Sequence, residues 1–328
     1  MAISIEKSKE KYIAEAKSDW PIFFQPWWLD IVCSDGWDAL VASNINEELV
    51  GFMPLPFSIN GKRIIMPPLT PFLGLYNTYS GKTKLTEHNS YEKKLVTDLI
   101  NHLPCFDYYE QRWPRSFTNW LPFFWNNFTA NTKYTYVLND LSNLDIIKIN
   151  YRKNIKSDIA KAAKKIKIIH SDNSDAFFQV FQKTHDRQGI TNHLPIQFIN
   201  TLTSACISRN QGCILFAEDD AKKIHAAVFM VWDQHSAYLI ASGGDPALRN
   251  SGATSLLYNE AICVASTKTQ ALDFAGSMIE PIEKFIRAFG ATQVPYFELQ
   301  KTNSRTMLIK KALVQIAYAV TKKNSGKR

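Results

Sequence analysis

The pattern of apolar and polar positions is clearest in the second half of the chain. Apolar residues recur there every three or four positions in several windows, which predicts helices. The expected helices cover residues 152–166, 173–187, 196–208, 252–267 and 279–289. Short apolar runs rich in β-branched residues predict strands at 213–218, 224–232, 236–242, 271–275 and 293–299. Strands joined by short turns and then by helices indicate a mixed α/β sheet.

The first half predicts shorter elements with more loop between them. Expected helices cover 26–34 and 89–102, and expected strands cover 37–42, 48–55, 62–66 and 132–138. Prolines between 66 and 77 predict an ordered loop, because proline lacks the N–H that a helix requires. A chain of 328 residues exceeds the roughly 250–300 residues at which single cores stop growing. We therefore expect two domains, at 1–150 and 151–328.

Positive charge is concentrated at the start of the second half. The chain carries a formal net charge of +8, and basic proteins attract phosphates, nucleic acids and anionic lipid surfaces. Seven basic residues against the single acid Asp158 lie between 152 and 167: Arg152, Lys153, Lys156, Lys161, Lys164, Lys165 and Lys167. The apolar stripe of this segment is narrow. It is predicted to form a surface for polyanions, with tRNA or an anionic membrane bound through Lys161, Lys164 and Lys165.

Several classes of protein have little support in the sequence. The five cysteines form no CxxC pair, and the histidines lack the HExxH spacing, so no metal site is expected. Neither a GxSxG motif nor a GxxxxGK[ST] loop occurs, which disfavours hydrolases and NTPases. The first 19 residues lack the apolar segment of a signal peptide, and no run of about 18 apolar residues occurs. These features predict a cytoplasmic protein, with peripheral association at the inner membrane left open.

Aromatic residues are dense between 113 and 125. Six of them occur in this segment, which two prolines interrupt: Trp113, Phe117, Trp120, Phe123, Phe124 and Trp125. Such a cluster fills a junction between domains or forms a wall of a groove that binds the acceptor. The sequence leaves both interpretations open.

A glycine-containing loop separates the strand at 236–242 from the long helix at 252–267. Arg249, Gly252 and Ala253 stand where this helix begins. Free backbone N–H groups at a helix N-terminus bind phosphates, and small residues allow a pyrophosphate to approach. The alternative is an ordinary turn followed by a helix cap.

Two segments resemble a known superfamily of transferases. Arg249-Asn-Ser-Gly252-Ala253-Thr254 resembles the R/Q-x-x-G-x-G/A loop with which GNAT enzymes hold the pyrophosphate of acyl-coenzyme A. Residues 272–299 resemble the C-terminal signature of Fem-like GNAT proteins, and residues 151–165 and 185–189 resemble further segments of that family. The signature is matched by Asp273, Phe274, Gly276, Ser277, Phe285, Phe289, Gly290, Pro295 and Tyr296.

The resemblance implies a bacterial transferase with two tandem GNAT-like domains and a groove between them. The donor would be acyl-coenzyme A or an acyl carrier, and the acceptor an amine or hydroxyl on a small molecule or cell-envelope precursor. Ile286 stands where the members that form peptidoglycan bridges carry a lysine, which favours coenzyme A. Two alternatives remain: an aminoacyl-tRNA-dependent transferase acting on a cell-wall precursor, and a non-catalytic binding protein with a GNAT fold.

Acyl transfer requires a base for the acceptor and donors for the oxyanion. Asp273 is the first candidate for the base and Glu280 the second, with Ser277 beside the reaction centre. Asp273 could instead be a structural carboxylate that caps the following helix.

The remaining candidates bind substrates. His185, Arg187 and Tyr296 are expected to meet the acceptor, although His185 and Arg187 also suit a solvated helix end. The donor phosphates are assigned to a set at the start of the long helix: Arg249, Gly252, Ala253 and Thr254.

Overall fold

The computed structural model describes residues 3–77, 84–189, 191, 193–276, 278–309 and 313. The first half contributes seven of the described strands: β1 (Ile3–Lys7), β2 (Trp37–Asn44), β3 (Leu49–Ser58), β4 (Arg63–Ile64), β5 (Tyr76–Asn77), β6 (Tyr108–Arg112) and β7 (Thr129–Leu138). Its helices are α1 (Lys9–Glu15), η1 (Ile22–Phe24), α2 (Pro26–Val32), α3 (Leu85–Asn101), α4 (Leu121–Trp125) and α5 (Leu144–Ile149).

The second half contributes the remaining described elements. Its strands are β8 (Ile166–Ser171), β9 (Gly212–Asp219), β10 (Ile224–Trp232), β11 (Ala237–Gly244), β12 (Leu272–Asp273) and β13 (Thr292–Thr302). Its helices are α6 (Lys153–Ala162), α7 (Ser174–Gln188), α8 (Ile196–Ser208), η2 (Pro246–Ser251), α9 (Ala253–Ser266) and α10 (Glu280–Arg287). The mixed α/β fold class expected from the sequence is confirmed.

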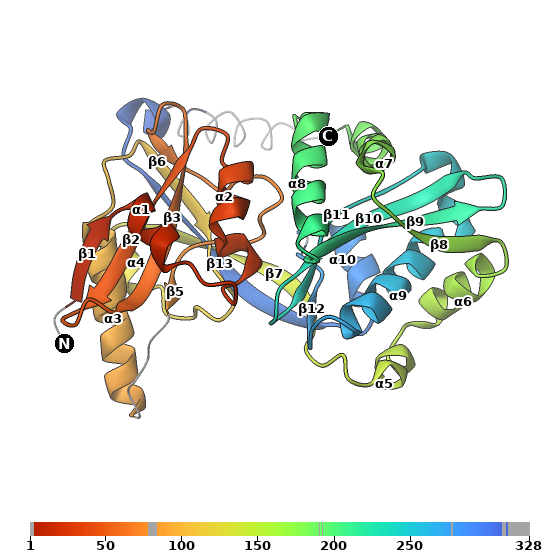
Figure 1. Ribbon diagram of the computed structural model, residues 1–328, viewed down its shortest axis with the longest axis horizontal. Helices are drawn as coiled ribbons and strands as arrows, with labels where there is room; N and C mark the ends of the chain where they lie inside the picture. The colour runs from red at the N-terminus through yellow and green to blue at the C-terminus, as the bar shows by residue number, and fades with distance from the viewer. Residues whose placement is uncertain are drawn as a thin grey trace, which may run out of the picture.

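The described strands form one mixed sheet that runs through both halves (Figure 1). Its order is β1-β2-β3-β4-β6-β13-β7-β12-β11-β10-β9-β8, and β5 pairs with β3. The last strand therefore lies in the middle, antiparallel to β7 from Thr292 to Gln300 and to β6 from Glu298 to Thr302. The division at residue 150 remains a prediction, and the sheet is not interrupted there.

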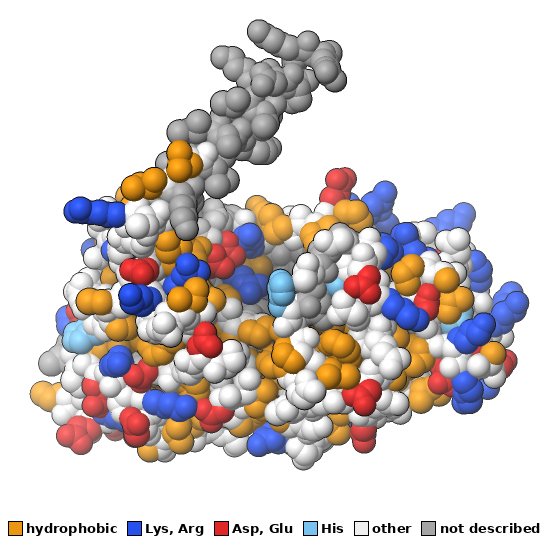
Figure 2. Space-filling view, turned by 90° about the horizontal axis from the view of Figure 1, so that it is seen from above, with side chains coloured by type: hydrophobic (Ala, Val, Ile, Leu, Met, Phe, Trp, Pro, Cys, Tyr) orange, Lys and Arg blue, Asp and Glu red, His pale blue; other side chains and the backbone are white. Residues whose placement is uncertain are grey.

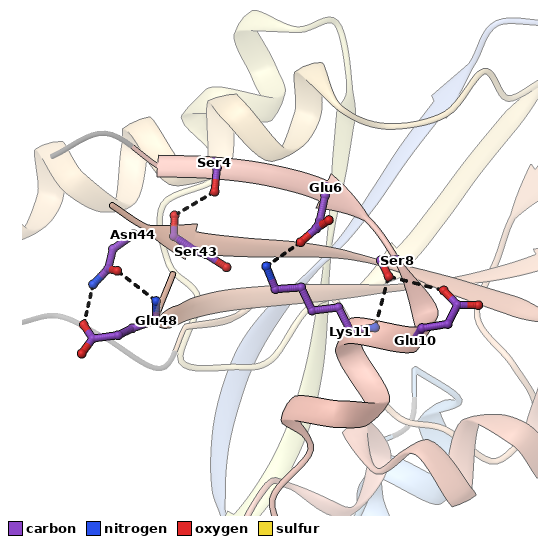
Figure 3. Close-up of polar contacts among 8 residues, drawn as sticks. All are labelled: Ser4, Glu6, Ser8, Glu10, Lys11, Ser43, Asn44 and Glu48. Atoms are coloured by element: carbon purple, nitrogen blue, oxygen red, sulfur yellow. Dashed lines mark hydrogen bonds and ion pairs between the residues drawn. The ribbon is translucent and has the colours of Figure 1, made fainter. Parts of the chain in front are cut away.

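Polar contacts attach the N-terminal edge strand, which the sequence pattern did not predict. Strand β1 pairs antiparallel with β2, and Ser8 accepts a hydrogen bond from the Lys11 N–H at 3.1 Å as the N-cap of α1 (Figure 3). Lys11 also forms an ion pair with Glu6 of β1. Charged side chains on an edge strand discourage pairing with a second chain.

Alternate residues of the central strands face two different cores. In β10, Phe229 and Val231 join a core with α7 and α8, whereas Val228 and Met230 join a core with α9. The first core also contains residues from the first half: the Phe23 ring lies 4.8 Å from that of Tyr238. Such shared apolar packing holds the two halves together.

Two expected elements end earlier than the sequence pattern suggested. The basic helix expected at 152–166 ends at Ala162, and Ile166 begins strand β8. The four-residue spacing from Ala162 to Ile166 imitated another helical turn, although both residues are buried in one core. The strand expected at 62–66 is reduced to Arg63–Ile64.

Helix α6 packs directly on the start of α9. Gly252 has a φ of +79°, and a Cβ there would lie 2.4 Å from the Asp158 carbonyl oxygen. The Asp158 carboxylate accepts a hydrogen bond from Ser255 Oγ at 3.3 Å, and Lys161 Nζ donates to the Asn250 carbonyl. Gly252 is therefore required for close approach of two helices.

This packing predicts that Gly252→Ala is strongly destabilising. The left-handed backbone costs about 1–2 kcal/mol for alanine, and overpacking adds about 1–3 kcal/mol. Gly61→Ala is the matched control, because Gly61 has a φ of +75° but nothing within 4 Å of its Cβ position. Chemical denaturation should show a larger loss of unfolding free energy for Gly252→Ala. Equal losses would mean that the contact with Asp158 adds nothing.

Candidate active site

Strands β11 and β12 separate where the sheet opens. They pair in parallel at only two positions, Ala237 with Leu272 and Tyr238 with Asp273. Strand β12 then ends, whereas β11 continues to Gly244. A crevice at the C-terminal end of diverging strands is a common location for ligand sites in α/β folds. Asp273 lies at this point of separation.

A pocket lies beside Asp273, lined by residues from both halves of the chain. It contains about 290 Å³ of atom-free space, part of which is open to solvent. The lining residues are Pro71, Phe72, Trp113, Arg115, Thr135, Asp273, Ala275 and Tyr296. The walls are largely apolar and a few polar groups converge, as in small-molecule sites.

Hydrogen bonds fix the carboxylate of Asp273 in this pocket. Its Oδ1 atom accepts the Thr135 hydroxyl and, at 2.8 Å, the Ala275 N–H. Among the described residues, none donates a hydrogen bond to Oδ2. Asp273 is only 5% exposed, so a substrate donor could replace water at Oδ2. The sequence also allowed Asp273 to be a structural carboxylate that caps the following helix. The structure modifies this alternative, because the carboxylate caps the turn at Ala275 rather than helix α10.

Burial controls the ionisation of both titratable candidates in the pocket. Desolvation raises the pKa of Asp273, and the Thr135 hydroxyl and the Arg115 charge partly offset this rise. Burial also raises the pKa of Tyr296, with the Arg112 charge acting in the opposite direction. Asp273 is therefore a stronger base than an exposed aspartate, and Tyr296 keeps its proton and can donate a hydrogen bond.

The other catalytic and acceptor-binding candidates lie outside this pocket lining. Glu280 is exposed at the start of α10, and Arg187 is exposed near the end of α7. The His185 ring hydrogen-bonds through Nδ1 to the Phe181 carbonyl at 3.0 Å. Ser277 lies outside the described residues. The structure thus brings together Asp273 and Tyr296 from the expected set.

The loop before α9 offers less room for phosphates than the sequence suggested. Gly252 and Ala253 are buried, whereas Arg249 and Thr254 are exposed. The space beside Gly252 is filled by helix α6. The idea that Gly252 leaves room for a pyrophosphate is therefore disfavoured by packing, and only Arg249 and Thr254 keep accessible side chains.

A basic cleft lies next to this loop. Its lining consists of Lys161, Ala162, Lys164, Lys165, Ile166, Asp219, His225 and Ser251, around about 750 Å³ of atom-free space that includes open solvent. Lysine and arginine side chains gather at the end of the molecule that carries α6 (Figure 2). The three lysines expected to bind polyanions therefore meet the loop before α9 in one concave surface.

The aromatic segment serves mainly the core of the first half. Phe117 and Phe123 pack on the Trp113 ring, with centroids 4.2 and 4.9 Å away. Trp113 also lines the pocket, whereas Phe124 and Trp125 are largely exposed. Of the six aromatic residues, Trp113 thus supports the interpretation of this segment as a wall of the acceptor groove.

Four residues that line the pocket had no signal in the sequence. Thr135 lay within an expected strand, and Arg115, Pro71 and Phe72 belonged to loops. The sheet register, which places Tyr296 and Asp273 beside β7, identifies Thr135, and the packing of the loops identifies the other three.

The described part of the chain contains neither a metal-binding cluster nor a membrane-spanning helix. Within it, no group of three or more His, Cys, Asp or Glu residues is placed to hold a metal ion. Its helices are too short or too polar for any of them to cross a membrane.

Comparison with known proteins assigns the fold. Residues 150–277 match the acetyltransferase (GNAT) domain family. FemX superposes with a TM-score of 0.68 at 11% identity, covering 92% of this chain and 98% of FemX. A tandem GNAT protein from the clavulanic acid biosynthesis pathway gives a TM-score of 0.50 at 9% identity, covering 91% and 98%.

A third structure is the C-terminal domain of a putative lysylphosphatidylglycerol synthetase from Agrobacterium fabrum. It gives a TM-score of 0.53 at 9% identity and covers 94% of both chains. No curated protein matches the sequence. The family match over residues 150–277 and these folds agree with the resemblance drawn from residues 272–299: the chain contains a GNAT-type domain and has a Fem-like fold.

Proposed function

We propose that this transferase moves an acyl group from acyl-coenzyme A or an acyl carrier to an amine or hydroxyl in the Asp273 pocket. The observation that carries the proposal is the buried Asp273 carboxylate, which is fixed through Oδ1 and has no described partner at Oδ2. It lies where strands β11 and β12 separate, so donor and acceptor could approach from the two sides of the gap.

The reaction would begin with the acceptor donating a hydrogen bond to Asp273 Oδ2. The acceptor nitrogen or oxygen attacks the donor carbonyl carbon and gives its proton to the carboxylate. The tetrahedral intermediate then collapses, and its carbon–sulfur bond breaks, or its carbon–oxygen bond if the donor is an ester. The proton passes to the leaving thiolate or alkoxide. Thr135 and the Ala275 N–H keep the carboxylate oriented throughout.

The donor phosphates are assigned to the basic cleft and the adjoining loop. Lys161, Lys164 and Lys165 would supply positive charge there, with Arg249 and Thr254 exposed on the loop. At the start of α9 the Asp158 carboxylate already accepts a hydrogen bond from Ser255, and a second negative group there would be repelled.

A tRNA-borne donor is the second candidate. The basic cleft favours it, because three lysines around an open concave surface suit a nucleic-acid backbone as well as a coenzyme. A cell-envelope precursor would then be the acceptor, and the basic surface would also allow contact with an anionic membrane.

Asp273→Asn is predicted to lower the turnover number about 10²–10⁴-fold, the usual contribution of a general base. The amide keeps an oxygen that can accept from Thr135 and Ala275, so those two hydrogen bonds survive. Steady-state kinetics with a panel of acyl donors would measure the loss. Wild-type turnover would remove Asp273 from the mechanism.

The raised pKa of Asp273 predicts two pH effects. Activity should fall as the pH decreases through this raised value, so the acidic limb lies above the ordinary aspartate value of 3.8. Folding stability has the opposite sign: the buried carboxylate is costly once ionised, so Asp273→Asn should unfold at an equal or higher temperature at neutral pH. A lower melting temperature would indicate that the ionised carboxylate is structural.

Replacing Lys161, Lys164 and Lys165 with Gln is predicted to weaken donor binding and its salt dependence. Loss of three phosphate contacts should reduce the slope of log K against log salt by about two to three. Replacing Lys84, Lys93 and Lys94 with Gln is the control, because these exposed lysines lie at or near α3 in the first half. Calorimetry with an acyl-coenzyme A panel and fluorescence titration with aminoacyl-tRNA would distinguish the two donors. Equal slopes for the two triple variants would exclude the basic cleft as the surface that binds the donor phosphates.

A further inference from the structure

We propose that the acceptor is an amino acid, or a group that ends like one, with its carboxylate on Arg115 and its amine on Asp273. The inference rests on the proposed function, because it concerns the substrate class of the same pocket. It follows from the placement of one cation and one buried acid around a small space with apolar walls.

Arg115 contributes a positive charge to this pocket for which the described structure shows no contacting partner. Its side chain is partly buried, and none of the described residues forms a hydrogen bond or an ion pair with it. A partly desolvated guanidinium without a partner is unfavourable unless a ligand supplies the anion. Its planar fork fits a carboxylate in a bidentate manner.

The charge of Arg115 partly offsets the rise that burial causes in the pKa of Asp273, but the two side chains do not form a contact ion pair. The two side chains line the same pocket without direct contact between their charged groups. The Asp273 carboxylate is turned to Thr135 and the Ala275 N–H instead. A ligand that carries both charges could therefore contact Arg115 with its anion and Asp273 Oδ2 with its cation.

The rest of the lining favours a small zwitterion over a lone anion. Asp273 is the only acidic residue among the lining residues, so an acceptor amine has one carboxylate to meet. Pro71, Phe72, Trp113 and Ala275 form the apolar walls. Apolar walls strengthen both charge interactions by excluding water.

The pocket wall is also rigid, which restricts the size of the acceptor. Gly74 packs against the Trp113 ring so closely that a Cβ would lie 2.6 Å from a ring carbon. The Trp113 N–H donates to the Phe297 carbonyl at 2.9 Å, and the Leu73 N–H donates to the Arg112 carbonyl at 2.8 Å. A wall held on both sides restricts the width of the pocket, so we expect it to select a compact acceptor.

The test measures binding of small probes to the full chain, without any donor. The probes are glycine, L-alanine and D-alanine, compared with alaninamide, which lacks the carboxylate charge, and N-acetylalanine, which lacks the free amine. Ligand-observed NMR titrations would give their affinities. We expect at least one amino acid to bind, and its amide and N-acetyl forms to bind about tenfold more weakly or worse.

Arg115→Met is expected to weaken amino-acid binding about tenfold or more, while leaving the already weak binding of alaninamide unchanged. Arg115→Lys should restore part of the affinity, because it keeps the charge but not the fork. Arg209→Met is the matched control, since Arg209 lies at the end of α8 over the Trp27 ring and outside the pocket lining. The melting temperature of Arg115→Met should not fall, because no described partner is lost.

Three results would overturn the inference. They are the absence of binding by every amino acid, equal affinities for L-alanine and alaninamide, and equal affinities in wild type and Arg115→Met. Failure of the proposed transfer reaction gives a different pattern: probe binding that depends on Arg115 would persist, but no acyl donor would react. The two failures are therefore separable.

Discussion

The pairing of β13 with β6 and β7 is the constraint on which the rest of the structure depends. This strand follows the GNAT domain in the chain, yet it lies between two strands of the first half. Its backbone hydrogen bonds bring Tyr296 beside β7, and β7 in turn pairs with β12 at Asp273. Without this insertion the sheet would divide in two, and neither half would contain all of the pocket lining.

The candidate site contains two charged groups whose burial is unfavourable, and packing elsewhere in the fold offsets that cost. A buried carboxylate is unfavourable, and burial raises the pKa of Asp273 despite two hydrogen bonds to Oδ1. Arg115 adds a partly desolvated cation to the same pocket. Groups of this kind persist where surrounding packing is strong, and perturbed ionisation is typical of reactive sites. The apolar core shared by the two halves supplies that packing.

Helix α6 contacts both regions that were considered for donor binding, namely the start of α9 at Gly252 and the basic cleft. Its buried side, at Ile155 and Ala162, packs into the core, while its backbone at Asp158 contacts Gly252 at the start of α9. Lys161 of this helix lines the basic cleft, together with Lys164 and Lys165 just beyond its end. One helix therefore fills the space beside the glycine and supplies positive charge nearby. Positive charge and space for a donor occur in the cleft rather than at Gly252.

The sequence by itself determined most helices and strands of the second half and the resemblance to GNAT proteins. Apolar periodicity sets helices and strands, and the ordered residues between 272 and 299 predicted the GNAT relationship, which the family match over residues 150–277 supports. Strands β1, β5, β6 and β8 were not predicted, because short segments with mixed polarity carry weak periodicity. Tertiary structure alone decided the strand order, the partners Thr135 and Arg115, and the packing at Gly252. Contacts between residues more than a hundred positions apart depend on the register of the whole sheet, which no local pattern encodes.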